Sequence, residues 1–231
     1  MNGRTIMTIL DNKVFTERNN INIDITYRCP LACLSCMRKR YVDRGKPIDG
    51  IDMSIESFEK ITDFFTRINF CGQVSDPTAH PKFIQFLEIC KRKGNEVEIH
   101  NAASHRSFDW YKKAFQAYPE AIWEFGLDGL PEDSHNYRKN QNGPKLWEVM
   151  KWASGEGYLV DWQWIYFIYN YRDVPKGYEM AKEHKINFIT VHSDRWGKTI
   201  KHLKPPEAIM KCNDVYEVMN LLESGYIDNG R

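Results

Sequence analysis

The chain has 231 residues, 42% of them hydrophobic and 13% aromatic, which suffices for one α/β domain of barrel size with a sizeable core. Its formal net charge of +1 gives no electrostatic basis for a nucleic acid or membrane surface as partner. Residues 1–20 lack the apolar stretch of a signal peptide, and no run of about 18 apolar residues predicts a membrane span. These features predict a cytoplasmic protein whose thiols stay reduced.

Strand-like and helix-like segments alternate along the chain. Strands are predicted over residues 20–27, 68–73, 96–101, 121–128, 158–169 and 186–192. Helices are predicted over residues 54–68, 81–93, 107–118, 145–155 and 175–184. Such alternation favours a parallel sheet joined by helical crossovers, either twisted open or curled into a barrel. The predicted fold class is α/β, a partial (β/α)6 TIM-like barrel with a short C-terminal extension.

The predicted strands are not continuous apolar runs. In the first strand Ile21, Ile23 and Ile25 alternate with polar residues, and in the third Glu98 and His100 alternate with apolar ones. Since successive side chains point to opposite faces of a sheet, one face is predicted to meet helices and the other a polar lumen. Salt bridges at the strand ends are the alternative explanation. The carboxylates on the polar face favour a substrate with amines or other cationic groups.

Three of the six cysteines crowd into the segment after the first strand. Cys29, Cys33 and Cys36 have the spacing C-x3-C-x2-C. Thiolates are the ligands of iron–sulfur clusters, and three of them leave one iron of a cubane without a protein donor. Such an open position is typical of a catalytic metal site. A zinc loop or free thiols are the alternatives, although zinc requires a fourth ligand and no histidine lies nearby in the sequence.

This motif resembles the signature of the radical S-adenosylmethionine (SAM) superfamily. The resemblance implies an enzyme, broadly an oxidoreductase, with a [4Fe-4S] cluster on Cys29, Cys33 and Cys36 and with SAM as second cofactor. In that family the open iron binds SAM, which is cleaved to a 5′-deoxyadenosyl radical that abstracts hydrogen from a substrate. A reductase, flavodoxin or ferredoxin is implied as electron donor. Ser35 departs from the family, which carries an aromatic residue before the third cysteine.

Further segments resemble the SAM-binding motifs of the family. Residues 71–81 resemble the form C-G-x-x-G-D-P-x-x-H-P, which implies contacts from Gly72, Ser75 and Asp76 to the SAM amino group. Ser75 stands where relatives carry glycine. Asn101 ends the third strand, where relatives carry a Thr-Asn-Gly turn and this chain has Ala102 instead of the glycine.

The later strands end in comparable motifs. Asp128 and Arg138 resemble the family's S-L-D-G segment and its downstream arginine, which commonly pairs with the SAM carboxylate, although Gly126 replaces the serine. Asn170 matches an asparagine of relatives near the adenosine. All these residues lie at C-terminal strand ends, where barrel active sites form. Cys71 and Cys90 are predicted to be buried small side chains.

The predicted organisation is an N-terminal extension over residues 1–19, a radical SAM partial barrel over 20–195, and a tail over 196–231. Cys212 and residues 226–231 resemble the start of an auxiliary-cluster domain of the SPASM or twitch type, but the further cysteines of such a domain do not follow. Cys212 is therefore interpreted as a lone thiol. A peptide is the first substrate hypothesis, a small metabolite or nucleoside the second, and a non-catalytic iron–sulfur or zinc-binding module the third.

Overall fold

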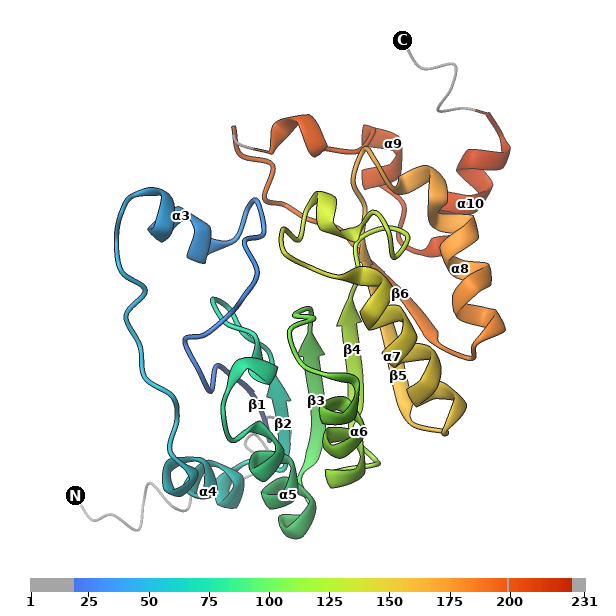
Figure 1. The fold of residues 1–231 in the computed structure, drawn as a ribbon. Helices are drawn as coiled ribbons and strands as arrows, with labels where there is room; N and C mark the ends of the chain where they lie inside the picture. The colour runs from blue at the N-terminus through green and yellow to red at the C-terminus, as the bar shows by residue number, and fades with distance from the viewer. Residues whose placement is uncertain (1–18, 199, 226–231) are drawn as a thin grey trace, which may run out of the picture.

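The computed structural model describes residues 19–198 and 200–225. Within them, six parallel strands form one sheet in the order β1-β2-β3-β4-β5-β6. The strands are β1 (Asn20–Ile23), β2 (Arg67–Phe70), β3 (Glu96–Asn101), β4 (Ile122–Gly126), β5 (Leu159–Ile165) and β6 (Asn187–Val191). Helical crossovers join neighbouring strands, which confirms the predicted α/β partial barrel (Figure 1). The predicted extension over residues 1–18 and the motif at 226–231 lie outside the described residues.

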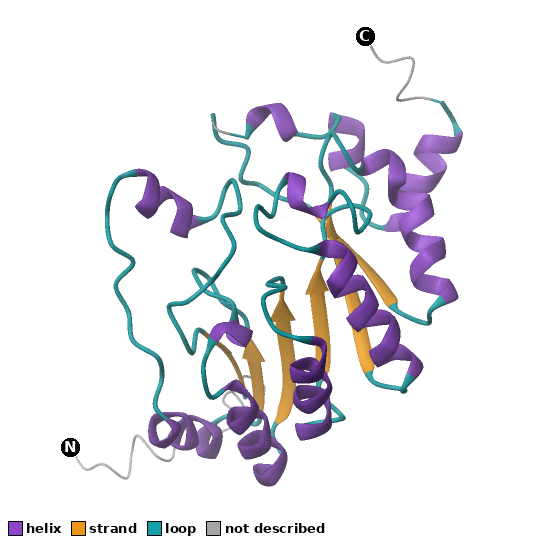
Figure 2. Cartoon of the chain, in the orientation of Figure 1, coloured by secondary structure: helices purple, strands orange, loops and turns teal. Residues whose placement is uncertain are grey.

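Five crossover helices cover the apolar face of the sheet (Figure 2). They are α4 (Ile55–Phe64), α5 (Phe83–Lys93), α6 (Phe108–Ala117), α7 (Gly143–Gly155) and α8 (Val174–Glu183). Helix α4 begins where the Ser54 side chain accepts from the backbone N–H of Ser57, which satisfies one of its free donors. Helix α5 ends at Gly94, whose φ of 74° is a conformation that glycine adopts without a steric cost.

The core lies between these helices and the sheet. Trp123 on β4 and Trp162 and Trp164 on β5 are completely buried. Alternate residues of the same strands point to the opposite face, where the strand register places His100 beside Glu124 and Glu124 beside Asp161. The half-exposed polar residues of this face form the lumen that the sequence alternation predicts.

Three helices outside the crossovers were not predicted. Helix α3 (Met37–Asp43) follows the cysteines; it buries none of its side chains, and its N-cap makes no side-chain hydrogen bond. In the tail, α9 (Glu207–Met210) and α10 (Val215–Glu223) follow β6. Helix α10 packs beside α8, and Tyr178 and Tyr216 share a hydrogen bond of 2.8 Å. None of the described helices is long and apolar enough to cross a bilayer.

Candidate functional site

The cysteine loop connects β1 to α3 at the C-terminal edge of the sheet. Two backbone hydrogen bonds attach it to the segment after β4: the N–H of Ala32 donates to Lys139 O at 3.1 Å, and that of Leu34 donates to Tyr137 O at 3.2 Å. The N–H of Cys36 donates to Cys33 O at 3.1 Å. These bonds hold the three cysteines beside the segment that carries Arg138.

The three thiols suit an iron–sulfur cluster. Cys29, Cys33 and Cys36 are half-buried and form no disulfide. Burial raises the pKa of Cys29 to about 12, with Asp76 and Cys33 adding to the effect. Burial also raises the pKa of Cys33 to about 11, although the Arg138 charge opposes the rise. In the metal-free chain the thiols of Cys29 and Cys33 therefore stay protonated at neutral pH, and a bound metal would supply the positive charge that favours their thiolate forms.

Asp128 and Arg138 form a buried ion pair at the end of β4. The Asp128 carboxylate is completely buried; its Oδ2 accepts from Nε of Arg138 at 2.7 Å and its Oδ1 accepts from the Ile165 N–H at 3.0 Å. Burial alone would lower the pKa of Arg138, but the charges of Asp128 and Cys33 outweigh it and raise that pKa. No described residue accepts from the terminal nitrogens of Arg138. The charged guanidinium can therefore bind an anion.

Gly126 makes room for this arginine. A Cβ atom on Gly126 would lie 2.6 Å from Nη2 and 2.8 Å from Cζ of Arg138. Gly126 replaces the serine of the family motif, and the Arg138 side chain thus occupies the space that a side chain at position 126 would take.

Asp76 and Asn101 meet where the loops after β2 and β3 adjoin. The Asp76 carboxylate is buried and accepts from the N–H groups of Ala102 at 2.9 Å and Ala103 at 2.8 Å. It also accepts from Thr78 N at 3.0 Å and from Nδ2 of Asn101 at 3.2 Å. Both carboxylate oxygens are thus bonded to protein donors, so Asp76 holds the two loops together.

Gly72 and Ser75 form a tight turn above β2. A Cβ atom on Gly72 would lie 2.2 Å from the carbonyl oxygen of Ser75, so the turn requires glycine. The Ser75 hydroxyl donates to Asp24, which also accepts from Gln73 N at 2.7 Å. Asp24 was not assigned to the site from the sequence; its signal is that it is the one acidic residue among the polar positions Asn22, Asp24 and Thr26 of the first predicted strand.

Asn170 stabilises the turn after β5. Its Oδ1 accepts from Phe167 N at 2.7 Å and its Nδ2 donates to Ile165 O at 2.9 Å, and the residue is completely buried. Asn170 does not line the cavity that several other predicted site residues share.

A cavity of about 200 Å³ joins five of the predicted SAM-site residues, whereas Asp128 and the three loop cysteines do not line it. It is lined by Cys71, Gly72, Ser75, Asp76, His100, Asn101, Ala102, Glu124, Gly126, Arg138 and Gln163. Cys90 is buried as predicted, but the same prediction is wrong for Cys71, which is half-exposed because it leaves β2 at the rim of this cavity. Glu124 and Gln163 were not assigned to the site from the sequence.

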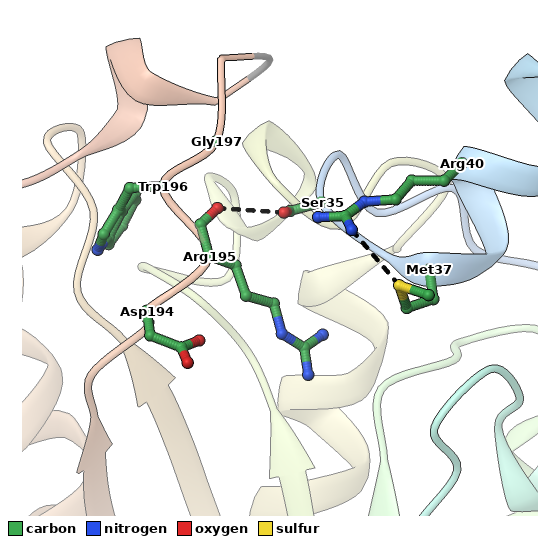
Figure 3. Close-up of a pocket in the computed structure, with 7 residues that line it drawn as sticks. All are labelled: Ser35, Met37, Arg40, Asp194, Arg195, Trp196 and Gly197. Atoms are coloured by element: carbon green, nitrogen blue, oxygen red, sulfur yellow. Dashed lines mark hydrogen bonds between the residues drawn. The ribbon is translucent and has the colours of Figure 1, made fainter.

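A second cavity of about 590 Å³ lies between the start of α3 and residues 194–197 (Figure 3). The hydroxyl of Ser35 is buried and donates to Arg195 O at 3.3 Å. At the position where the family carries an aromatic residue, Ser35 thus makes a polar contact to the segment after β6. Arg40 and Arg195 line this cavity together with a single carboxylate, that of Asp194.

Comparison of the sequence with known proteins gives a match of low identity over about half of the chain. No protein-family profile matches it. Over 114 residues, 47% of the chain, it is 25% identical to the tungsten-containing aldehyde ferredoxin oxidoreductase cofactor-modifying protein of Pyrococcus furiosus, of which this match covers 30%.

Solved structures show the same fold. Streptococcus suis SuiB bound to S-adenosylmethionine superposes with a TM-score of 0.64 at 14% identity, over 97% of this chain and 53% of SuiB. The enzyme anSMEcpe with AdoMet and the Kp18Cys peptide gives 0.55 at 15% identity, over 74% of this chain and 51% of that one. Methylornithine synthase PylB gives 0.54 at 13% identity, over 96% and 72%. The chain therefore spans about half the length of SuiB and anSMEcpe, and it has the fold of the radical SAM enzymes that its cysteine motif resembles.

Proposed function

We propose that the chain is a radical SAM enzyme whose Cys29, Cys33 and Cys36 hold a [4Fe-4S] cluster. The observation that carries the proposal is the fixed loop of three free thiols beside Arg138, in a fold shared with SAM-bound enzymes. When bound, the cluster would supply the electron that cleaves SAM to methionine and a 5′-deoxyadenosyl radical for hydrogen abstraction.

The residues of the chain would bind and orient SAM. The Arg138 guanidinium, held by Asp128, would pair with the SAM carboxylate through its free terminal nitrogens. The turn from Gly72 to Ser75 would offer backbone carbonyls to the amino group. Asp76 and Asn101 would act through the loops that they join.

Asn170 would shape the turn after β5 near the adenosine. Its two side-chain bonds to the backbone at Phe167 and Ile165 fix that turn without leaving its amide free for a ligand. We therefore assign Asn170 an indirect role.

A peptide is the proposed substrate. SuiB was solved with its precursor peptide SuiA and anSMEcpe with the Kp18Cys peptide, and both share the fold of this chain. A small metabolite or nucleoside is the alternative, in line with the similarity to methylornithine synthase.

An acidic flavodoxin or ferredoxin is the proposed electron donor. The exposed Arg40 and Arg195 beside the cysteine loop offer a basic surface for it. The six free cysteines support a reducing compartment, the cytoplasm.

The test is anaerobic assay of 5′-deoxyadenosine after reconstitution with iron and sulfide and addition of SAM and dithionite. We expect product from the wild type and from Cys90→Ala, a core cysteine outside the loop, and none from Cys33→Ala. A bound cluster without product would favour a non-catalytic iron–sulfur module. Equal iron content in Cys33→Ala and Cys90→Ala would contradict the assignment of the ligands.

A further inference from the structure

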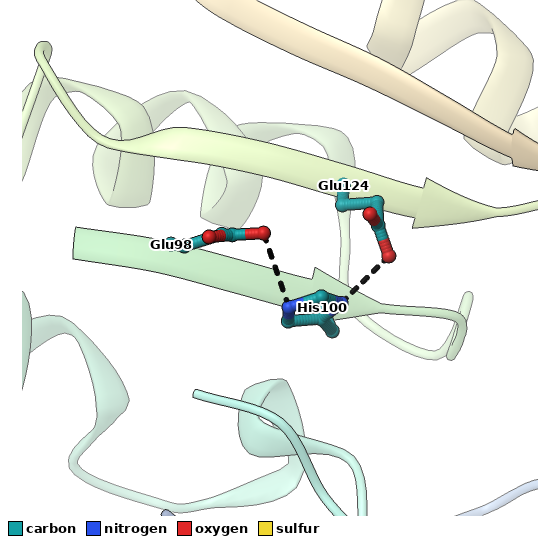
Figure 4. A group of neighbouring side chains, drawn as sticks. All are labelled: Glu98, His100 and Glu124. Atoms are coloured by element: carbon teal, nitrogen blue, oxygen red, sulfur yellow. Dashed lines mark hydrogen bonds and ion pairs between the residues drawn. The ribbon is translucent and has the colours of Figure 1, made fainter. Parts of the chain in front are cut away.

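The polar face of the sheet carries a row of acidic residues inside the lumen. The register of β3, β4 and β5 aligns His100, Glu124 and Asp161 across three strands. Glu98 lies two residues before His100 on the same face of β3 (Figure 4). His100 and Glu124 also line the cavity of about 200 Å³ that reaches Arg138, so the row is continuous with the proposed SAM site.

Glu124 is buried but only half of its carboxylate is bonded. Its Oε1 lies 2.6 Å from Nδ1 of His100 and also accepts from Nε2 of Gln163. No described residue donates to Oε2, although Glu124 is only 8% exposed. Glu124 lines the cavity, and its Oε2 is not one of the buried side-chain atoms that lack a partner, so this oxygen is open to water there. It can accept a hydrogen bond from a ligand that displaces this water.

The charges on this face do not balance. The strands contribute three carboxylates to it, those of Glu98, Glu124 and Asp161. Their basic partners on the strands are Arg67, which contacts Glu98 at 2.6 Å, and His100. Arg138 does not compensate them, because Asp128 already pairs with it.

The titration of three lumen groups agrees with a negative potential. Burial lowers the pKa of His100, but Glu124 and Glu98 outweigh it and raise that pKa. Burial, followed by Glu124, raises the pKa of the Cys71 thiol. Burial also raises the pKa of Asp161, and Glu124 and Glu98 add to that rise while Asn187 opposes it.

Two kinds of cation fit carboxylates beside a histidine. The ligand atoms of Glu98, His100 and Glu124 lie within 4.8 Å of one another, which also suits a single metal ion. However, Oε2 of Glu98 is bonded to Arg67, and both ring nitrogens of His100 face carboxylates, Glu124 at 2.6 Å and Glu98 at 3.3 Å. Among the described residues, Oε2 of Glu124 and Oδ2 of Asp161 accept from no protein donor. These two oxygens favour an organic cation that donates hydrogen bonds.

We infer that the lumen contains a subsite for the ammonium or guanidinium group of a basic side chain of the substrate, with Glu124 as its main acceptor and Asp161 beside it. The inference deepens the proposed function, since it assigns a substrate class to the space next to the SAM site. Glu124 and Asp161 bind the cation and thereby set which hydrogen of the substrate faces the radical.

The test is binding of N-acetyl-lysine N-methylamide to the full chain, followed by ligand-observed NMR, with the neutral norleucine counterpart as reference probe. We expect the lysine probe to bind and the norleucine probe to bind at least about tenfold more weakly, because only the former donates a charged hydrogen bond. Glu124→Gln should lower the affinity for the lysine probe by about tenfold or more. Neither measurement requires SAM cleavage, so failure here is separate from failure of the proposed enzyme activity.

Two further variants make the result specific. Glu96→Gln makes the same substitution at the exposed start of the neighbouring strand β3 and should leave binding unchanged. Asp161→Asn should also weaken binding of the lysine probe, and it keeps a hydrogen-bond partner for Asn187, 3.0 Å away. It serves as the test variant if Glu124→Gln does not fold. Equal affinity for the two probes, full affinity in the folded Glu124 variant, or an affinity for lysine weaker than about 10 mM would overturn the inference. Tight binding of Mn²⁺ lost in Glu124→Gln, without lysine binding, would replace it by a metal site.

Discussion

Nη2 of Arg138 lies 2.6 Å from the position that a Cβ atom on Gly126 would occupy. The guanidinium passes over the glycine to reach Asp128, with which it shares a bond of 2.7 Å. Two features therefore fix the direction of the Arg138 side chain: Gly126 has no side chain in its way, and the buried Asp128 carboxylate binds its guanidinium. The pair presents the free end of the arginine to the cavity.

We expect Gly126→Ala to displace Arg138 and to weaken SAM binding. The added methyl group overfills the site, which should also cost about 1–3 kcal/mol of unfolding free energy. The measurements are chemical denaturation and SAM titration. Gly155→Ala is the matched control: no atom lies within 4 Å of its added Cβ, and alanine in the last turn of α7 should raise stability by up to about 1 kcal/mol. Equal SAM affinity in both variants would remove the role of Gly126.

The cysteines of the metal-free chain should react slowly with iodoacetamide. Because the pKa of Cys33 is raised to about 11 and that of Cys29 to about 12, their thiolate fractions at pH 8 are small. The alkylation rates, read by peptide mass spectrometry, should rise about tenfold per pH unit up to pH ~10. A rate that levels off near pH 9 would show unperturbed thiols and would contradict the buried setting of the loop.

The alternation of strands and helices could be predicted because its signals are local. The period of the strands and the spacing of the cysteines are both patterns within a few residues. Only the folded structure shows which side chains already use their hydrogen-bonding groups to contact other parts of the protein. Asp76 and Asn170 are both completely engaged by nearby backbone, which their motif positions do not reveal.

Other site features escaped because they depend on contacts between strands. Glu124 enters the cavity through the register of β3 and β4, and its free oxygen follows from the positions of His100 and Gln163. Helix α3 could not be predicted from periodicity because it buries no face. The prediction that Cys71 is buried was wrong because a small apolar residue at the end of a strand can lie either in the core or at the rim of a cavity. Which of the two occurs depends on the neighbouring loop, and the sequence of the strand does not show it.

His100 should titrate above its ordinary pKa of 6.5 in the folded chain, because Glu124 and Glu98 favour the imidazolium more than burial opposes it. The stability that this raised pKa contributes is complete below pH ~6.5 and is lost as the pH rises through the folded-state value. The measurement is NMR titration of the ring protons. In the same spectra His80 and His105, whose pKa values burial lowers, provide internal references. Glu124→Gln should lower the pKa of His100; an unchanged value would contradict the contact.

Arg40→Glu should slow turnover with a protein electron donor more than turnover with dithionite. Arg40 is exposed beside the cysteine loop, so reversing its charge weakens attraction to an acidic donor and makes the rate less sensitive to salt. The measurement is the rate of 5′-deoxyadenosine formation with a flavodoxin and with dithionite at two ionic strengths. Lys176→Glu, on α8, reverses a charge on another helix and is the control. Equal losses in the two variants would place the donor elsewhere.

The most direct test of the central claim is the electron paramagnetic resonance spectrum of the reduced, reconstituted chain before and after addition of SAM. Three cysteine ligands leave one iron open, so SAM should bind there and shift the spectrum, and Cys90→Ala should behave like the wild type. A four-iron cluster whose spectrum SAM leaves unchanged would contradict the claim that Cys29, Cys33 and Cys36 form a SAM-binding site.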